Sequence, residues 1–259
     1  PVHFSGSSCD MEKIYDLSKK YNFSIIEDAS HAIGSTYKNM PVGNTRFSDF
    51  TVFSFHPVKI ITTGEGGIAT TNSLEIFEKL KALRTHGIVK EKDKFNLTPA
   101  GPWHYEQQFL GLNYRMTDIH AALGISQLRR LDDICAQRNF LLERYKENII
   151  SKNISFLDIP YNCFSSVHLC IIKLKILDKL IHKKFFNYFR ENNIGVQLHY
   201  TPIHLQPYYR NLGFAEGYLI NSENYAKQAI SIPIFPNLSI KEQDYIIKKT
   251  NFFLNNLST

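Results

Sequence analysis

The sequence predicts an α/β protein with two domains. A strand-like start at Pro1–Phe4, helical spacing over Met11–Tyr21 and a buried strand at Phe23–Ile26 form a βαβ unit, right-handed by default. The long helical pattern from Thr117 to about Asn148 changes from small and apolar to charged and amphipathic, as expected of a helix that leaves one core and enters another. We therefore expect a boundary near Asp132, with domains at 1–131 and 132–259.

The rest of the first domain follows from short apolar runs and turn residues. Residues 29–49 have the glycine and proline content of a loop, and strands are expected at Phe50–Phe55 and Gly67–Thr71. Ser73 is a good cap for a helix that ends near Arg84. Residues 85–115 are irregular, and a loop of that length more often serves function than structure.

The second domain is expected to be a smaller α/β module. Alternation predicts a half-buried strand at Val167–Lys175. The other expected elements are a helix at Asp178–Asn192, a strand at Gly195–Leu198, a loop at His199–Leu212, a helix at Ser222–Ala229, a strand at Ile230–Ile232 and a helix at Ser239–Asn255.

Composition and charge disfavour several classes of protein. The 43% hydrophobic content is ordinary for a globular protein, and the +6 charge is spread in short lysine clusters typical of solvated faces, so we expect no nucleic-acid partner. The four cysteines lack CxxC spacing and a histidine at zinc spacing, so they indicate reduced thiols and no metal. No apolar run reaches membrane-spanning length, so we expect no membrane association and a cytoplasmic location.

The stretch FTVFSFHPVKIITTGEGG, residues 50–67, carries the clearest chemistry. Lys59 follows a buried strand, stands among the apolar residues Val58, Ile60 and Ile61, and precedes a turn with three glycines. Desolvation favours the neutral amine, which is the form that attacks a carbonyl, so the pattern suggests a Schiff-base lysine. The structural alternative is a lysine that extends from a loop into solvent.

A carboxylate stands about thirty residues earlier in FSIIEDASHAIGS. Asp28 follows a strand at the edge of the sheet where ligands bind in open α/β folds, and His31 comes three residues later. Such a carboxylate could keep a pyridine nitrogen protonated. It could equally be the N-cap of the following turn.

Together these segments resemble the DegT-type, pyridoxal-phosphate-dependent sugar-nucleotide aminotransferases, of fold type I. The resemblance extends over PVHFSG, EDASHAIGS, FSFHPVKIITTGEGG, LRTHG, GLNYRMTDIHAALGISQL and VQLHYTPIHLQPYY. It implies an incomplete parallel sheet of the large domain followed by a smaller C-terminal α/β domain. Within the family, GPWHYEQQFLGLNYR and HYTPIHLQPYYR are most similar to the transaminases of pseudaminic acid biosynthesis.

The resemblance implies roles in binding pyridoxal 5′-phosphate. Lys59 would hold the cofactor covalently and move a proton, and Asp28 would pair with the ring nitrogen. His31 stands where many relatives carry glutamine near the phenolic oxygen, and its structural alternative is a buried histidine. Ser54 would contact the phosphate. Asn113 would reach the phosphate of the partner protomer, which implies a homodimer with shared active sites; a simple turn before a helix is the alternative.

The substrate side is implied by the same resemblance. His199 and Tyr200 match the loop that enters the sugar-nucleotide pocket, and Arg115 stands beside Asn113 in GLNYR. Aromatic residues on such a loop suit stacking on a base or sugar face. A metal pair of His199 and His204 lacks a third ligand, so we expect none.

The implied reaction moves the amino group of L-glutamate to C4 of a UDP-linked 4-keto-6-deoxy-hexosamine. Another nucleotide-linked keto sugar remains open as the substrate. A related sugar 3-dehydratase carries histidine at the lysine position, so Lys59 argues against it. A third alternative is a cofactor-binding regulator without turnover, although no helix-turn-helix or basic face supports it.

Relatives of this family carry further residues before the strand that begins here at Pro1. The resemblance implies that those residues supply three strands, a phosphate-binding Gly-Thr or Gly-Ser turn and an aromatic residue that stacks on the pyridine ring. We therefore expect the chain to be part of a longer enzyme, and to aggregate or bind the cofactor weakly when produced alone.

Overall fold

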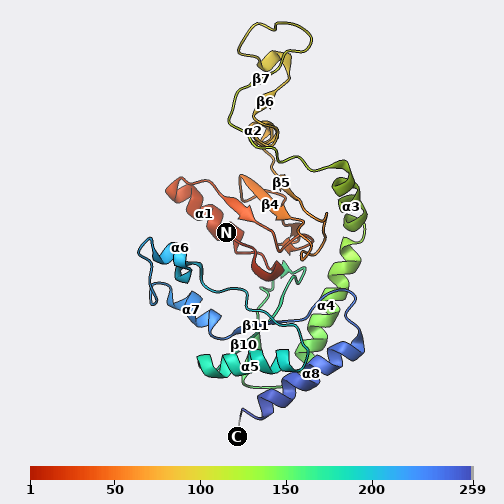
Figure 1. The fold of residues 1–259 in the computed structure, drawn as a ribbon, viewed down its shortest axis with the longest axis vertical. Coiled ribbons are helices and arrows are strands. Elements are labelled where there is room, and N and C mark those ends of the chain that lie inside the picture. The colour runs from red at the N-terminus through yellow and green to blue at the C-terminus, as the bar shows by residue number, and fades with distance from the viewer. Residues whose placement is uncertain (258–259) are drawn as a thin grey trace. The chain divides into compact units, whose positions relative to one another are not determined.

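The computed structural model describes residues 1–257, and in it the chain separates into two units. The first unit contains Pro1–Asp132 together with the short segment Asn162–Phe164. The second contains Asp133–Tyr161 and the chain from Ser165 onward. Each unit has its own sheets and helices (Figure 1).

The first unit is built on a three-stranded sheet in the order β1-β4-β5. β1 (Ile26–Asp28) pairs in parallel with β4 (Phe50–Ser54), and β5 (Gly67–Thr70) pairs with β4 in antiparallel orientation. Val2 forms a parallel bridge with Asp28, so α1 (Met11–Tyr21) connects two parallel segments as predicted. Met11 of α1 packs against Ile25 and Tyr37.

The beginning of the first unit differs from the prediction in two places. The 3₁₀ turn η1 (Phe4–Gly6) includes Phe4, which the sequence suggested as the last residue of a strand. β1 begins at Ile26 rather than Phe23, because the Asp49 carboxylate accepts the N–H of Ile25 at 2.7 Å and Phe23 is left exposed.

Residues 29–49, predicted as loop, contain a small hairpin. β2 (Thr36–Tyr37) pairs with β3 (Met40–Pro41), and β9 (Cys163–Phe164) adds a third strand. The positive φ angles of Lys38 and Asn39, +49° and +62°, form the two-residue turn between β2 and β3.

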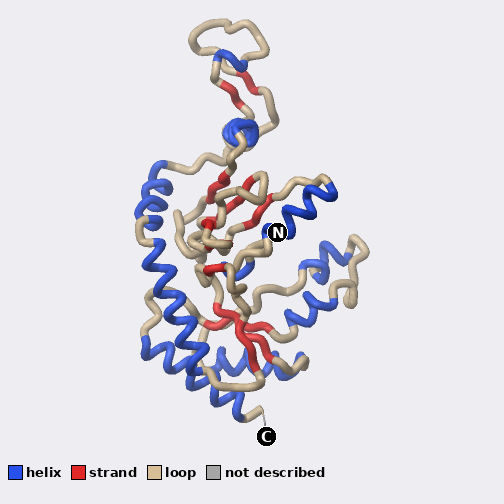
Figure 2. The backbone as a smooth tube through the Cα atoms, turned by 180° about the vertical axis from the view of Figure 1, so that it is seen from behind, coloured by secondary structure: helices blue, strands red, loops and turns tan. Residues whose placement is uncertain are grey.

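The helices of the first unit begin at side-chain caps. Ser73 caps α2 (Leu74–Leu83) and Thr117 caps α3 (Asp118–Leu128), each by accepting a backbone N–H. Between them lie β6 (Ile88–Val89), η2 (Lys92–Lys94) and β7 (Glu106–Gln107), in a segment that stands beyond α2 in Figures 1 and 2. The predicted single helix from Thr117 to Asn148 is wrong, because the chain breaks at Arg129–Arg130 before α4 (Leu131–Asn148).

The second unit contains an antiparallel sheet in the order β11-β10-β8. The central strand β10 (Cys170–Leu174) pairs with β11 (Ala229–Ile232) and β8 (Ile154–Phe156). The predicted half-burial of this strand is wrong, since Cys170, Ile171, Ile172 and Leu174 are all buried. The predicted strand at Gly195–Leu198 is reduced to one bridge between Gln197 and Ser231.

Helices complete the second unit. α5 (Lys179–Glu191) and α8 (Ile240–Asn255), which are among the helices drawn in blue in Figure 2, begin within one residue of their predicted starts. The side chains of Asp178 and Ser239 cap them. The loop 192–219 carries η3 (Ile203–Leu205) and α6 (Pro207–Arg210), and α7 (Ile220–Ala226) precedes β11.

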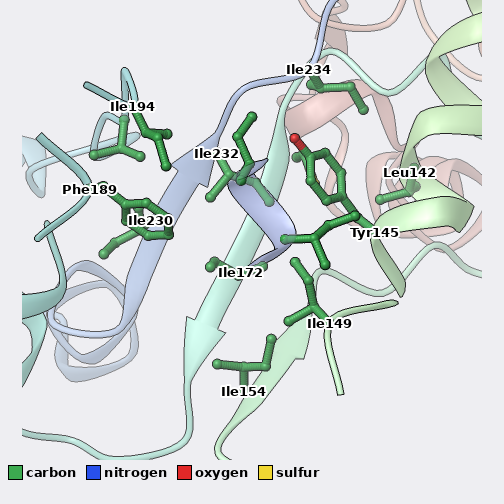
Figure 3. Packing of buried hydrophobic residues seen from close by; sticks show 14 of the residues in the cluster. Leu142, Tyr145, Ile149, Ile154, Ile172, Phe189, Ile194, Ile230, Ile232 and Ile234 are labelled. Atoms are coloured by element: carbon green, nitrogen blue, oxygen red, sulfur yellow. The ribbon is translucent and has the colours of Figure 1, made fainter. Parts of the chain in front are cut away.

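The core of the second unit fills the space between the sheet and its helices. Figure 3 shows Tyr145 of α4 and Phe189 of α5 packed around Ile172, Ile230 and Ile232 of the sheet. The hydroxyl of Tyr145 donates to the carbonyl of Pro233 at 2.9 Å, so the one polar atom of this buried ring is satisfied.

Within residues 1–257, the helices are all too short or too polar to cross a membrane.

Candidate active site

The predicted chemistry gathers at the carboxyl edge of the parallel strands. Asp28 ends β1 and Ser54 ends β4, and the register sets Asp28 opposite Val52, two residues before Ser54. Lys59 lies in the loop that follows β4, where its backbone N–H donates to the carbonyl of His56 at 2.9 Å. The ends of parallel strands are the usual place for ligands in open α/β sheets.

Lys59 is half-buried and lies near an acid. Burial lowers the pKa of its amine below the usual range, and the charge of Asp28 partly opposes that effect. The neighbouring Ile60 and Ile61 are buried and anchor the loop, whereas Lys59 itself is only half-buried. The result is a lysine with a larger neutral fraction than an exposed one.

Asp28 remains ionised in the same place. Burial alone would raise the pKa of its carboxyl, but hydrogen bonds from Ser30 and the charges of His31 and Lys59 lower it below the usual range. The backbone N–H of Ser30 donates to Oδ1 at 3.0 Å, so the carboxylate also organises the turn after β1. The predicted N-cap role and the predicted acid role are therefore both compatible with the geometry.

His31 is buried and held by the η1 turn. Its Nδ1 accepts the backbone N–H of Ser5 at 3.4 Å, and its ring lies 5.9 Å from the ring of Phe4, between centroids. Its charge, like that of Lys59, lowers the pKa of the Asp28 carboxyl. Asp28, His31 and Lys59 thus stand in the segments at the carboxyl ends of β1 and β4.

Ser54 and His56 follow one another along the end of β4. The Ser54 hydroxyl accepts the backbone N–H of His56 at 3.4 Å, and His56 Nδ1 accepts the N–H of Val58 at 3.4 Å. Both contacts belong to the turn that leads to Lys59, so each residue has a structural role there whatever else it does.

The glycine turn behind Lys59 is tightly packed. Gly66 has a φ of +153°, and a side chain there would meet Thr63 Oγ1 at 2.5 Å and Met116 Cε at 2.6 Å. Thr63 is buried and donates from Oγ1 to the carbonyl of Glu65 at 2.7 Å. A glycine is required at 66 because both the backbone angle and the space exclude a Cβ.

A buried acid–histidine pair lies behind Asp28, and sequence reasoning missed it. His3 Nε2 donates to Glu27 Oε2 at 2.6 Å, and Glu27 Oε1 accepts the hydroxyls of Ser48 and, at 3.1 Å, Thr51. Burial would raise the pKa of Glu27, but the hydrogen bonds from His3, Ser48 and Thr51 hold it below the usual range. The only sequence signal was the alternation of Glu27 and Asp28, which turns their side chains to opposite faces of β1.

Asn113 and Arg115 lie elsewhere in the first unit. Asn113 forms an isolated antiparallel bridge with Thr85, and its side chain is exposed. Arg115 is also exposed and, with Tyr114, Met116 and His120, lines a cavity of about 930 Å³ bounded by β5 and α2.

His199 and Tyr200 belong to the second unit. His199 Nδ1 lies 2.7 Å from the Ser231 hydroxyl, and the Tyr225 hydroxyl donates to the His199 carbonyl at 3.0 Å. The Tyr200 ring stands edge-on to His199 and is exposed. The loop therefore presents one anchored imidazole and one exposed aromatic ring.

His204 is a structural residue. Its Nε2 lies 2.9 Å from Glu223 Oε1, both side chains are buried, and the Glu223 carboxylate also accepts the backbone N–H of Gly217. Among residues 1–257 there is no group of three histidine, cysteine or acidic side chains suited to hold a metal ion.

Comparison with known proteins gives the family. The model of the DegT/DnrJ/EryC1/StrS aminotransferase family matches residues 1–251. The chain belongs to this family. UDP-4-amino-4,6-dideoxy-N-acetyl-beta-L-altrosamine transaminase from Campylobacter jejuni (strain 81-176) is 38% identical over 247 residues, which are 95% of this chain and 62% of that protein. The chain thus spans about three fifths of the length of such relatives.

Solved structures of the family have the same fold. PseC from Helicobacter pylori, described as an aminotransferase of pseudoaminic acid biosynthesis, superposes with a TM-score of 0.89 at 30% identity, over 98% of this chain and 66% of PseC. The PLP form of the sugar aminotransferase Spr1654 from Streptococcus pneumoniae gives 0.84 at 31% identity, over 100% and 68%. The predicted α/β fold of PLP-dependent aminotransferases is confirmed.

Proposed function

We propose that the protein acts in a pyridoxal-phosphate-dependent transamination of a UDP-linked 4-keto-6-deoxy-hexosamine at C4, with L-glutamate as the amino donor. The observation that carries this proposal is that the half-buried Lys59, which follows β4, and Asp28, which ends β1, both stand at the carboxyl edge of the β1–β4 pair. Family membership supports the aminotransferase chemistry.

The donor set fits pyridoxal phosphate. Lys59 offers an amine for the aldehyde, Asp28 a carboxylate for the ring nitrogen, and Ser54 a hydroxyl at a strand end for the phosphate. When bound, the cofactor would supply the aldehyde that takes up the amino group and the ring that accepts electrons.

Lys59 and Asp28 would have different roles in the reaction. Lys59 Nζ would bind the aldehyde carbon covalently and, once released by glutamate, carry the proton between the substrate carbon and the cofactor. Asp28, ionised at neutral pH, would keep the proton on the ring nitrogen by charge and hydrogen bonding. The buried Ile60 and Ile61 hold the lysine loop in place.

The remaining predicted residues are proposed to complete the site. Asn113 is exposed on its loop and would reach the cofactor phosphate of a second protomer, which makes a homodimer the working unit. His199, Tyr200 and Arg115 are proposed to contact the nucleotide sugar. In Tyr200 the exposed ring supports stacking, and in Arg115 the exposed guanidinium supports contact with a diphosphate.

The sugar is proposed from relatives named for the altrosamine transaminase reaction, which are 35–38% identical to this chain. A different nucleotide-linked keto sugar is the alternative substrate, because a UDP-4-amino-4-deoxy-L-arabinose–oxoglutarate aminotransferase from Shewanella sediminis is 33% identical. The four free cysteines favour a reducing compartment such as the cytoplasm.

The test is covalent capture followed by spectroscopy. Borohydride reduction of the protein with pyridoxal phosphate should fix the cofactor on Lys59, identified by peptide mapping. Lys59→Ala should lose the label, whereas Lys13→Ala, an exposed lysine of α1, should keep it. Labelling of another lysine in Lys59→Ala at the wild-type level would refute the assignment.

Turnover distinguishes an enzyme from a regulator. Adding L-glutamate should convert the bound cofactor to its amine form, seen as a change in absorbance, and a 4-keto sugar should reverse it. A panel of UDP- and dTDP-linked 4-keto sugars identifies the substrate. Cofactor binding without any change on adding glutamate would indicate a binding protein instead.

A further inference from the structure

Two of the four cysteines lie in the same part of the first unit. Cys9 stands two residues before α1 and Cys163 is in β9, and both are half-buried. Their side chains pack against one small cluster, formed by Met11, Ile25 and Tyr37. The Sγ of Cys163 lies 3.9 Å from the carbonyl oxygen of Ser8, which belongs to the peptide group that leads into Cys9. The thiol of Cys163 thus approaches the backbone of Cys9, although 155 residues separate Ser8 from Cys163 in the sequence.

Cys9 has a base beside it. Its backbone N–H donates to His3 Nδ1 at 3.1 Å, so the lone pair of the imidazole is turned toward Cys9. Burial lowers the pKa of His3, but hydrogen bonds of its ring with the side chains of Cys9 and Glu27 raise it, to about 9. The Cys9 thiol can therefore donate either to this imidazole or to the Val2 carbonyl, which lies at 3.2 Å.

The imidazole is in turn oriented by a carboxylate. His3 Nε2 donates to Glu27 Oε2 at 2.6 Å, and both side chains are buried. The charge of Glu27 would stabilise the imidazolium that forms when His3 takes a proton. A thiol, an imidazole and a carboxylate in this order are the arrangement that activates a cysteine as a nucleophile.

Cys163 has the properties of a second, less reactive thiol. Burial raises the pKa of its thiol, and its Sγ lies 3.6 Å from Oδ1 of Asn162. Because the thiolate is the nucleophile, Cys163 is expected to react after Cys9. β9 pairs with β2, which places Cys163 opposite Tyr37 within the first unit. A bond between Cys163 and Cys9 would tie β9 to the segment that leads into α1.

We propose that Cys9 and Cys163 form an oxidation site that reacts with hydroperoxides and closes a reversible disulfide. His3 takes the proton of the Cys9 thiol, and the thiolate attacks one oxygen of the hydroperoxide. The O–O bond breaks, Cys9 becomes a sulfenic acid, and the leaving oxygen receives the proton from His3. The Cys163 thiol then attacks the Cys9 sulfur, so the S–S bond forms and the sulfenic oxygen leaves as water with the proton of Cys163. Two thiols are oxidised to a disulfide, and the hydroperoxide is reduced to an alcohol or, from hydrogen peroxide, to water.

The reaction uses neither Lys59 nor a cofactor, so the inference does not rest on the proposed function. Disulfides that form and break in this way serve redox sensing in reducing compartments, where a small thiol reverses them.

Peptide mapping after oxidation tests the pair. The protein is treated with limiting hydrogen peroxide and then denatured in an alkylating reagent, and its non-reduced peptides are analysed by mass spectrometry. A cross-linked peptide with Cys9 and Cys163 is expected, and dithiothreitol should restore both thiols. Cys135 and Cys170 are buried and serve as internal controls that should remain reduced. Absence of this cross-link, or a cross-link to Cys135 or Cys170 instead, would overturn the proposal.

The roles of the two cysteines are tested with and without substitution. In the wild type, iodoacetamide should label Cys9 before Cys163, although both are half-buried. In Cys163→Ser, Cys9 should accumulate as the sulfenic acid, which dimedone captures, whereas in Cys9→Ser the Cys163 thiol should stay reduced. Preferential labelling of Cys163, or capture of its sulfenic acid in Cys9→Ser, would refute Cys9 as the attacking thiol.

The base is tested by the rate at which peroxide oxidises Cys9 in the Cys163→Ser protein. Adding Glu27→Gln keeps a hydrogen-bonding group at that position but removes the charge that stabilises a protonated His3, so the rate should fall about tenfold or more. Adding Ser48→Ala removes another hydrogen bond of Glu27 and leaves its charge, so the rate should stay within about threefold. Equal rates in these two proteins would refute activation by His3 and Glu27.

Discussion

Replacing Glu27 by glutamine tests the buried network behind the candidate site. Glu27 accepts hydrogen bonds from His3 Nε2 at 2.6 Å, from the Ser48 hydroxyl, and from Thr51 Oγ1 at 3.1 Å, and it is only 5% exposed. A hydrogen bond to a charged group contributes about 1.5–3 kcal/mol and a neutral one about 0.5–1.5 kcal/mol. Making all these bonds neutral should therefore lower the free energy of unfolding by about 2–4 kcal/mol.

The pH dependence of this loss depends on the protonation of His3. Burial lowers the pKa of His3, whereas hydrogen bonds to Cys9 and Glu27 and the charge of Glu27 raise it, to about 9. The backbone N–H of Cys9, however, donates to His3 Nδ1 at 3.1 Å, and a second ring proton would have to displace it. We assign a neutral His3 on that ground, with its proton on Nε2 toward Glu27.

A neutral His3 and a protonated His3 predict that the stabilisation by this network depends on pH over different ranges. Glu27 has a lowered pKa in the folded protein, so its stabilisation is present above the unfolded value of about 4.3 and is lost as pH falls through the folded value. A protonated His3 would stabilise the folded protein fully below its unfolded-state pKa of about 6.5. That contribution to the free energy of unfolding would be lost as the pH rises through the folded-state pKa of about 9. With a neutral His3, the difference between wild type and Glu27→Gln stays constant from about pH 6 to about pH 9.

The assay is guanidinium unfolding followed by circular dichroism at several pH values. Glu12→Gln, which removes an exposed carboxylate paired with Lys38, is the matched control and should change the free energy of unfolding by less than about 0.5 kcal/mol. A wild-type advantage that disappears between about pH 6.5 and about pH 9 would refute a neutral His3. A decrease of less than about 1 kcal/mol in the free energy of unfolding of Glu27→Gln would refute the charge-assisted hydrogen bonds of Glu27.

Further predictions concern the candidate catalytic residues. Asp28→Asn should retain some cofactor but lower the turnover number by several powers of ten, measured with glutamate and a keto sugar, because each 1.36 kcal/mol lost from the transition state is tenfold in rate; near-normal turnover would end its assignment. The same variant should label Lys59 with an amine reagent at lower pH than wild type, since the charge of Asp28 raises the pKa of that amine. A mixed dimer of Lys59→Ala and Asn113→Asp chains should exceed both mutant homodimers in activity, because one of its two sites escapes both lesions; no recovery would show that each chain builds its own site.

The elements that the sequence predicted well are those defined by local signals. Ser73 caps α2 as predicted, and Asp178 and Ser239 cap the helices that were predicted to start at those residues. A capping side chain acts on backbone N–H groups only two or three residues away. The amphipathic spacing of Met11–Tyr21 gave α1 with its exact bounds. Such signals need no knowledge of the tertiary structure.

The misses depend on partners distant in the sequence. Thr36 and Tyr37 form a local hairpin with Pro41 and Met40, and the third strand of that sheet comes from Phe164 and Cys163, more than a hundred residues later. Arg129 and Arg130 end α3 without a glycine or proline to announce the break. Neither feature can be seen in a window of local residues.

The candidate site shows the same division. Asp28, His31 and Lys59 could be proposed from the sequence because each stands at or just after the end of a strand in a motif of a few residues. The His3–Glu27 pair spans 24 residues and exists only because the βαβ crossover sets Val2 beside Asp28. Nothing in either residue's own neighbourhood indicates a buried pair.

The residues proposed for the site differ in how firmly the surrounding structure holds them. Around Lys59 and His31 the backbone takes angles that side chains disfavour, at Ser5 and Gly66, and buried contacts from Ser35 and Thr63 hold them there. A residue held by such contacts has its position fixed before any ligand binds. A group that must meet an aldehyde or a ring oxygen in one geometry requires a position of this kind. Asn113, Arg115 and Tyr200 are exposed on loops instead, as suits residues proposed to meet a second chain or a large, flexible nucleotide sugar. Substitutions near Ser5 or Gly66 should therefore affect the covalent attachment of the cofactor, whereas substitutions of the exposed loop residues should affect affinity for the substrate and assembly.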